Sequence, residues 1–573
     1  MRRLAPALPF AVLLAGFMVE EPSEALPSHA AIYASSAVAT DHALASEAGA
    51  TILARGGTAA DAAAAAMLAL GVASPASSGF GGGGFALYYR ASDQSLTYLD
   101  FRETAPAAST ADMFERAEAA APGSHPSEAG GLATGVPGEP AGIAELVSRF
   151  GRLPLRTIVA PAVTLARRGV PIGEYVARAG QGDIATALRR DRVLGRWFRS
   201  DAGGLVAGTR VKQPELARTL ETFGRAGARA VYDGPIGRAF VASNRAHGGI
   251  LTEADLRAYR VATRTPLDER HFGYRFVSSP PESAGGATML ASLDFLERAG
   301  VARSTEEPAF LHALAESWKG PYLDRQRYFG DPDHVDVPLS ALASAERRAA
   351  RASLFRADRA GDPAAYALPL PEPASRARTP DGGGTSHLCV VDAEGNVASV
   401  TTTINLWFGA RYTAAGVILN DEMDDFAKAV GQANAFGLVG GERNRPGPGR
   451  RPVSSMSPTI VLDDRGFRLC VGAAGGSRIP TATEQVALRV LVRGEQAHDA
   501  IAAPRVHHQA EPNVLRSERM APLDPNVLAR LVALGHAHDL VDNVAVVQLV
   551  HRREDGRLEA ASDPRKGGRP SGL

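Results

Sequence analysis

The chain has 573 residues, of which 45% are hydrophobic and 22% are charged, a composition typical of a soluble globular protein with a sizeable core. Its 62 basic and 62 acidic residues cancel, which argues against a nucleic-acid-binding protein, since these carry a basic excess. Its only two cysteines, Cys389 and Cys470, exclude a disulfide-rich scaffold and allow at most one disulfide. We expect both to be small buried residues of sheet strands. The length predicts roughly two to four domains or one large two-part fold.

The amino end has the three parts of a secretory signal. Arg2 and Arg3 precede an apolar stretch from Leu4 to Val19, and small and acidic residues follow as far as Ala25. The stretch is shorter than the roughly 20 apolar residues of a membrane-spanning helix. We therefore predict a signal peptide over residues 1–25 and an exported protein, periplasmic or secreted. An uncleaved amino-terminal membrane anchor is the alternative.

Helical and strand patterns alternate in the first hundred residues. The pattern predicts helix over 43–72, interrupted at Gly56 and Gly57, because glycine commonly ends a helix. The glycine run 81–84 leads into a strand over 85–89, and a second strand is expected over 94–101. A phosphate-binding loop would require a following helix and a Lys-Ser/Thr pair, and the sequence predicts neither after these glycines. We interpret the glycines as a tight turn where two backbones approach closely.

The middle of the chain is predicted to be mostly helical over 140–260, with a strand over 272–279 and a helix over 308–328. Residues 361–384 differ in kind, because they are rich in Pro, Ala and Gly and show no hydrophobic period. Such a segment is typical of an exposed, mobile connection. It ends at Gly384, directly before Thr385.

The second half shows strong strand signals. A hairpin is predicted from strands over 388–391 and 397–404, with further strands over 417–419, 459–462, 468–471 and 544–550. Helices are expected over 480–502 and 525–535. This half therefore predicts an α+β fold with an antiparallel sheet.

The junction between Gly384 and Thr385 suggests a nucleophile. If this bond is cut, Thr385 gains a free α-amino group with an ordinary pKa of about 7.7 to 8.0, so the amine can act as a base near neutral pH. Such a residue carries both the hydroxyl nucleophile and the base that activates it. Glycine before the bond gives the backbone the freedom that an intramolecular attack requires. A bland alternative is that Thr385 opens a strand only because of its β-propensity.

Ten segments, in order along the chain, carry a family resemblance. The most specific reads GTSHLCVVD at 384–392, and LDFRETAP at 99–106 is the clearest one in the first half. Together they resemble the γ-glutamyltranspeptidases, also called glutathione hydrolases, over about residues 30–570. The other eight segments are 57–63, 81–84, 135–139, 399–405, 420–426, 451–459, 472–477 and 561–568.

The resemblance implies the amino-terminal-nucleophile hydrolase fold, an α+β, four-layer αββα sandwich of two antiparallel sheets between helical layers. It also implies a precursor that cuts itself between Gly384 and Thr385. The large subunit would be residues 26–384 and the small, catalytic subunit residues 385–573, which would stay together as a heterodimer. No cofactor and no metal is implied.

The resemblance also implies the reacting groups. Thr385 matches the nucleophile, and Thr403 matches a second threonine that hydrogen-bonds it. Gly475 and Gly476 match the oxyanion hole, where backbone N–H groups face developing negative charge. Gly476 also contributes to substrate binding. Phe436 falls where some bacterial members have an aromatic lid residue.

A γ-glutamyl substrate such as glutathione presents an α-carboxylate and an α-ammonium, and the resemblance assigns residues to both. A guanidinium suits the carboxylate, because it can bind both oxygens at once. Bland alternatives are a surface ion pair for Arg102, a solvated turn for Asp425, a backbone cap for Ser454 and a bulge at Gly475. The implied carboxylate-binding residues are Arg102, Ser454 and Ser455, and the residues on the ammonium side are Asp425, Glu422 and Asn405.

The predicted reaction is transfer of the γ-glutamyl group to water or to an amino acid or peptide acceptor, through an ester on Thr385. One alternative is a related acylase or polyglutamate hydrolase of the same fold. Another is an uncleaved, inactive binding protein. We interpret His387 as structural, because strand alternation would turn it away from Thr385, and the adjacent His507 and His508 as structural because they are poorly placed to chelate one metal.

Overall fold

The computed structural model describes residues 29–370, 383–429, 434–438 and 440–573. The predicted signal peptide and the central part of the predicted connection, residues 371–382, lie outside the described residues. None of the helices that the model describes is long and apolar enough to cross a membrane.

Two seven-stranded antiparallel sheets form the centre of the molecule. The first runs β1 (His29–Tyr33), β20 (Leu558–Ser562), β19 (Val546–Arg552), β15 (Gly466–Ala474), β14 (Thr459–Asp463), β9 (Tyr274–Ser278) and β8 (Leu267–His271). The second runs β21 (Ser571–Gly572), β2 (Ala37–Thr40), β10 (Gly384–Val391), β11 (Val397–Asn405), β3 (Gly83–Arg90), β4 (Ser95–Phe101) and β7 (Ala262–Arg264). Each sheet combines strands from both halves of the chain.

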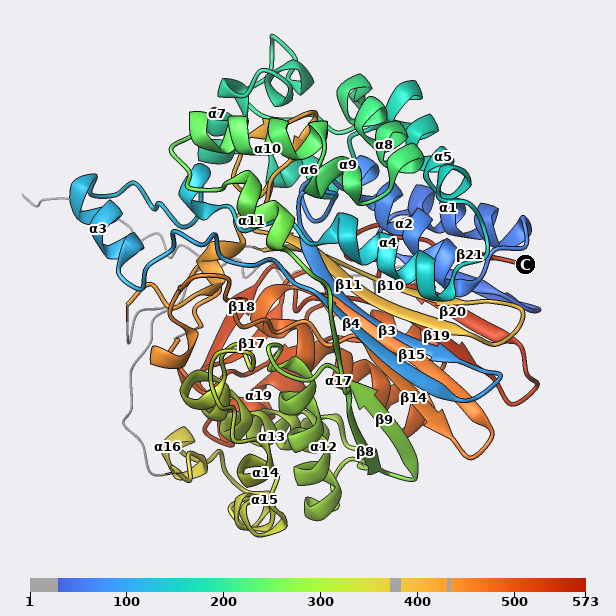
Figure 1. Cartoon of the computed structure of the whole chain (residues 1–573). Coiled ribbons are helices and arrows are strands. Elements are labelled where there is room, and N and C mark those ends of the chain that lie inside the picture. Colours follow the sequence, from blue (N-terminus) through green and yellow to red (C-terminus); the bar gives the residue numbers. More distant parts are fainter. Residues whose placement is uncertain (1–28, 371–382, 430–433, 439) are drawn as a thin grey trace, which may run out of the picture.

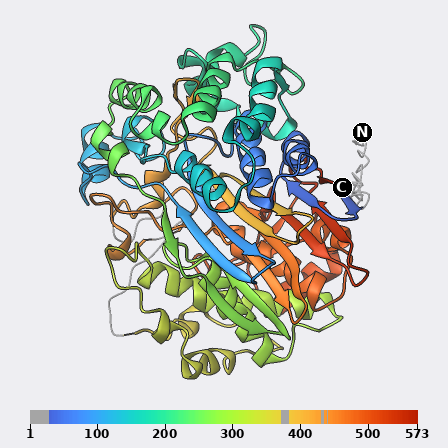
Figure 2. The same cartoon turned by 45° about the vertical axis from the view of Figure 1, so that its right-hand side comes forward.

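Helices cover the outer faces of both sheets, so the fold is the expected four-layer αββα sandwich (Figures 1 and 2). Against the β10–β11 sheet lie α1 (Ala43–Ala54), α2 (Ala59–Ala73), α4 (Glu139–Phe150) and α5 (Leu155–Arg168). Against the other sheet lie α12 (Gly285–Ala299) and α17 (Ile479–Leu491), and α13 (Glu307–Tyr328) packs on α12.

Side-chain alternation along β10 divides the core in two. Leu388 and Val390 pack with the helical layer above this sheet, whereas Cys389 and Val391 belong to the cluster between the two sheets. Both faces of the strand are buried, and its second half, Leu388–Val391, is apolar at every position. This explains why the strand signal was strong without clear alternation.

The predicted helix break and the glycine run both have a visible cause. Gly56, with φ +81°, follows α1, and a capping box between Thr58 and Asp61 starts α2. In the glycine run, a Cβ on Gly82 would lie 1.9 Å from the carbonyl oxygen of Thr403. The run therefore lets two backbones approach closely, which confirms the interpretation made from the sequence.

Most predicted elements of the second half are present, and the exceptions are at breaks and edges. The helix expected over 480–502 is two helices, α17 and α18 (Ala497–Ala502), with Gly494 at φ +73° between them. The strands β1, β2 and β20, which lie at or next to a sheet edge, were not predicted, because they are short and mostly made of small residues. The helix expected over 525–535 is α19 (Pro525–Ala533).

Part of the predicted mobile connection is ordered and buried, which corrects that expectation. Residues before the undescribed segment form α16 (Pro363–Tyr366), and Tyr366 is 1% exposed. Its hydroxyl donates a hydrogen bond to Glu316 on α13 at 2.6 Å. At the other end, Gly384 is already the first residue of β10.

The two cysteines are buried in sheet strands, as expected, and they form the one disulfide that two cysteines allow. Cys389 on β10 and Cys470 on β15 are bonded across 81 residues of chain. Both side chains point into the space between the two sheets, where strand alternation brings them face to face. The bond therefore ties one central sheet to the other.

Candidate active site

The predicted cleavage site lies at the start of β10, beside β11. Thr385 pairs with Thr403, and the register shifts between Gly384 and Thr385. The Thr403 hydroxyl donates to the carbonyl oxygen of Gly384 at 2.7 Å and lies 3.2 Å from the Thr385 hydroxyl oxygen. It also accepts from the backbone N–H of Asn405 at 2.8 Å. Because a hydroxyl has one proton to donate, its contact with Thr385 is one in which Thr403 accepts.

Lys566, to which the sequence alone assigns no role, contacts the same end of β10. The Lys566 ammonium donates to the carbonyl oxygen of Thr385 at 2.8 Å and to Asp41 at 2.6 Å. Its side chain is only 2% exposed. The segment 561–568 was recognised as a family match, but only the fold shows that its lysine reaches β10. Nothing in the sequence around Asp41 indicated this contact.

Gly475 and Gly476 follow β15 directly and have φ values of +148° and +58°, conformations that favour glycine. Gly475 and Thr385 line the same pocket, which has a volume of about 110 Å³. Tyr175, Trp407 and Lys566 are among its other walls. The predicted nucleophile and one of the predicted oxyanion glycines therefore face a shared space.

Phe436 packs closely against both glycine segments of the site. A Cβ added to Gly476 would lie 2.3 Å from its ring, and one added to Gly383 would lie 2.2 Å from it. The side chain is 8% exposed. It covers the backbone beside the predicted cleavage site.

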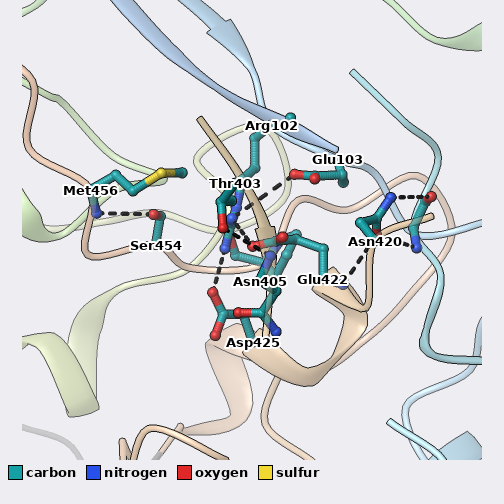
Figure 3. Close-up of polar contacts among 12 residues, drawn as sticks. Arg102, Glu103, Thr403, Asn405, Asn420, Glu422, Asp425, Ser454 and Met456 are labelled. Atoms are coloured by element: carbon teal, nitrogen blue, oxygen red, sulfur yellow. Dashed lines mark hydrogen bonds and ion pairs between the residues drawn. The ribbon is translucent and has the colours of Figure 1, made fainter. Parts of the chain in front are cut away.

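Arg102 is the centre of a second, charged cluster, the Arg102 cluster, made of Arg102, Glu103, Glu422 and Asp425 (Figure 3). The guanidinium donates to Glu422, to Asp425 at 2.5 Å, and to the carbonyl oxygen of Pro452 at 3.2 Å. Its side chain is 1% exposed. Arg102 is thus a buried residue with carboxylate partners, which excludes the surface ion pair considered from the sequence.

Three carboxyl groups share this one guanidinium, so their charges are not balanced. Burial raises the pKa of Glu422 to about 8, and it raises the pKa of Asp425, although Arg102 opposes both shifts. Burial also raises the pKa of Glu103 well above its usual range. The pKa of Arg102 is raised by Glu422 and Asp425 even though its burial acts in the opposite direction. The cluster therefore retains a proton near neutral pH.

The remaining predicted binding residues are Ser454, Asn405 and Ser455. They differ in the hydrogen bonds that their side chains already make. The Ser454 hydroxyl accepts from the backbone N–H of Met456 at 3.0 Å. The Asn405 amide donates to the carbonyl oxygen of Asp421 at 3.0 Å. Among the described residues, the buried Ser455 hydroxyl has no hydrogen-bond partner. An unpaired buried hydroxyl is costly, so Ser455 is the group best placed to gain from a ligand.

His387 is on the same face of β10 as Thr385, which corrects the reason given for excluding it. Its ring nitrogen Nδ1 lies 2.8 Å from the Thr401 hydroxyl, and burial lowers its pKa to about 3. A Cβ on Gly472 would lie 2.3 Å from the ring. The imidazole is thus neutral and fixed between the two sheets.

Two groups of side chains among the described residues have the spacing of metal ligands. In the first, His387 lies beside Cys389 and Cys470, whose sulfur atoms are joined in the disulfide. The second is His312, Glu316 and His536, where the Lys319 ammonium already bonds Glu316 at 2.6 Å. Lys319 therefore already places a positive charge next to the Glu316 carboxylate, where a metal ion would otherwise do so.

Known protein sequences match this chain over most of its length. The sequence model of the family described as gamma-glutamyltranspeptidase matches residues 45–573. The chain belongs to the γ-glutamyltranspeptidase family. A glutathione hydrolase proenzyme of Escherichia coli K12 is 36% identical over 531 residues, which cover 92% of this chain and 90% of that relative. A proenzyme of the same name from Pseudomonas sp. strain A14 is 37% identical over 507 residues, 87% of this chain and 85% of the relative.

Solved structures show the same fold. A cephalosporin acylase from Bacillus halodurans superposes with a TM-score of 0.77 at 25% identity, over 98% of this chain and 99% of that one. A chain of the Helicobacter pylori γ-glutamyltranspeptidase gives a TM-score of 0.53 at 30% identity, over 58% of this chain and 96% of that one. These neighbours confirm the amino-terminal-nucleophile hydrolase fold.

Proposed function

We propose that the protein is a self-cleaving γ-glutamyltransferase and glutathione hydrolase. Its donor is glutathione or a related γ-glutamyl compound, and water or an amino acid or peptide is the acceptor. The two relatives described above support this reaction, since both are named glutathione hydrolase proenzymes. The cleaved chain would be a heterodimer of residues 26–384 and 385–573.

Maturation uses the contacts at the start of β10. The Thr385 hydroxyl attacks the carbonyl carbon of Gly384, and the Thr403 hydroxyl donates to the carbonyl oxygen on which negative charge develops. The peptide bond is replaced by an ester, and water then releases Gly384. The α-amino group of Thr385 becomes free in this step and can act as the base for the next reaction.

Catalysis repeats the same attack on the substrate. Thr385 attacks the γ-glutamyl carbonyl, the N–H groups of Gly475 and Gly476 stabilise the oxyanion, and the amine product leaves. The substrate α-carboxylate binds Arg102, Ser454 and Ser455. The substrate α-ammonium binds Asp425 and Glu422 of the cluster, together with the neighbouring Asn405.

One observation carries the proposal: the end of β11 joins the nucleophile to the Arg102 cluster. Thr403 contacts Thr385, and Asn405 lies beside the cluster (Figure 3). A short substrate can therefore place a charged amino-acid head at the cluster and its carbonyl at Thr385. The cluster offers a guanidinium to a carboxylate and carboxylates to an ammonium, which are the two charges of a free α-amino acid.

Export is proposed for the same protein, to the periplasm or beyond. The signal-like amino end supports it, and the disulfide adds a second argument, because structural disulfides form and persist in oxidising compartments.

The test compares two chromogenic anilides that differ only at the head group. γ-Glutamyl anilide carries the α-ammonium, whereas glutaryl anilide has a hydrogen in its place. We expect the mature enzyme to prefer the γ-glutamyl compound by about 10²-fold or more in kcat/KM, because a buried charge left unpaired costs several kcal/mol. Equal or faster turnover of the glutaryl compound would favour an acylase. That alternative has an observation behind it, since the fold matches a cephalosporin acylase over nearly its whole length.

A further inference from the structure

We propose that the Cys389–Cys470 disulfide holds the predicted nucleophile in position against the predicted oxyanion glycines, so that turnover depends on the oxidation of these two thiols. The inference rests on the proposed function for the roles of Thr385 and Gly475. The bond itself is a feature of the fold.

The disulfide joins the two strands that carry the reacting groups. Thr385 and Cys389 are on the same face of β10, at alternate positions. Cys470 is on β15, which ends at Ala474, directly before Gly475. These strands belong to different sheets, so no ladder of backbone hydrogen bonds connects them. The disulfide is the one covalent link that the two cysteines of the chain allow.

The sheets are in close contact around this bond. The His387 ring lies against Gly472, where any larger residue would collide with it. The Cys389 sulfur lies 3.9 Å from the carbonyl oxygen of Gln548 on β19, and the Cys470 sulfur lies 3.9 Å from that of Ala398 on β11. A sliding of one sheet over the other would therefore be transmitted directly to both ends of the site.

Cleavage makes this restraint more important. In the uncut chain, Thr385 is held from both sides, because Gly384 precedes it in β10. After cleavage Thr385 is a chain end, and chain ends fray unless they are tied down. Lys566 holds its carbonyl group, and the disulfide fixes the strand behind it. A nucleophile displaced by about 1 Å can lose about 10²-fold in rate.

Glutathione, the proposed substrate, is a thiol that could reduce an exposed disulfide. Burial protects the Cys389–Cys470 bond from this reaction. Both cysteines are 0% exposed, and thiol–disulfide exchange requires access of a thiolate to one sulfur. Glutathione therefore cannot reduce the folded enzyme by this route. The bond forms before the core closes, when the two thiols exchange with the disulfide of a thiol oxidant. The cysteines lose two electrons and two protons, and the oxidant becomes two thiols.

The experiment compares the double variant Cys389→Ala/Cys470→Ala with Val550→Ala. Val550 is the cross-strand partner of Cys470 on β19 and is equally buried, so its truncation weakens the same core without cutting a covalent link. We expect both variants to mature and both to lose several degrees of Tm. In the double variant kcat should fall about tenfold with KM nearly unchanged, whereas Val550→Ala should keep its kcat. If the double alanine variant does not mature, Cys389→Ser/Cys470→Val fills more of the volume and replaces it.

Hydrogen exchange of the β10 peptide gives a readout that needs no substrate. We expect amides near Thr385 to exchange faster in the double variant than in Val550→Ala. Equal exchange and equal kcat in these two variants would overturn the inference, as would two free thiols in the unfolded, unreduced wild type. A failure of the proposed function is distinguishable, because it would appear as absent γ-glutamyl turnover in the wild type.

Discussion

The Thr385 end of β10 and the Arg102 cluster meet at the end of β11, and they are held in place by different interactions. The first is built on paired strands and neutral hydroxyls, with contacts of 2.7 and 3.2 Å to Thr403. The second is built on the segment after β4 and on the 3-10 helix Glu422–Asp425, where buried carboxyl groups share one guanidinium. The difference suggests that one region sets the rate of the chemical step and the other sets substrate affinity, and each prediction below tests that division.

Replacing the predicted nucleophile should have the largest effect. Thr385→Ala removes the hydroxyl that we propose attacks both Gly384 and the substrate, so the chain should remain whole and activity should fall about 10⁴-fold or more. A denaturing gel and a γ-glutamyl anilide assay measure the two outcomes. Appearance of the same two fragments in this variant would assign processing to another residue.

Arg102→Ala should weaken substrate binding and leave maturation intact. Loss of a buried charge that binds the substrate carboxylate costs about 2 to 5 kcal/mol, which we expect to appear mainly in KM. Maturation does not use the substrate carboxylate, so two chains should still form. A normal KM for γ-glutamyl anilide would remove Arg102 from the binding site. Arg102→Lys is the matched control that keeps the charge and loses the planar fork.

Thr403→Ala should do the opposite, by lowering kcat about 10²-fold with a smaller change in KM. Its hydroxyl contacts the nucleophile and the scissile carbonyl, and loss of one such donor has an effect of this size. Maturation should slow as well. Thr403→Ser keeps the hydroxyl and should be milder. Unchanged single-turnover acylation in Thr403→Ala would contradict the role assigned to it.

The smallest expected effects are on the pH dependence of KM and of the acylation rate, each of which should change several-fold. KM reports on the Arg102 cluster and the acylation rate on Thr385. Below about pH 8 the raised pKa of Glu422 leaves a proton in the Arg102 cluster. A protonated carboxyl cannot pair with the substrate ammonium, so KM should fall as the pH rises from about 6 to 8. Glu422→Gln should flatten this trend. The acylation rate should rise separately, through the pKa of the Thr385 amine near or below about 7.7 to 8.0. An acylation rate independent of pH would contradict the amine as base.

The sequence singled out many of the residues that the fold brings together at the candidate site, because they lie in ordered family segments. Thr385, Arg102 and Gly475 are conspicuous within those segments, and the strands around them have strong β signals. The sequence did not reveal that Lys566 reaches the carbonyl group of Thr385, or that Cys389 faces Cys470. Both contacts depend on which strands the fold places side by side, and no local pattern carries that information. The strands β1, β2 and β20 were missed for a similar reason, since pairing rather than propensity makes them strands.

The central claim is that Thr385 forms the γ-glutamyl ester. Mass spectrometry of the mature protein, quenched during turnover of a γ-glutamyl substrate, tests it directly. The account predicts a small chain that starts at Thr385, ends at Leu573 and gains the mass of one γ-glutamyl group on its amino-terminal peptide. A small chain that starts at another residue, or a γ-glutamyl adduct on a different peptide, would contradict it.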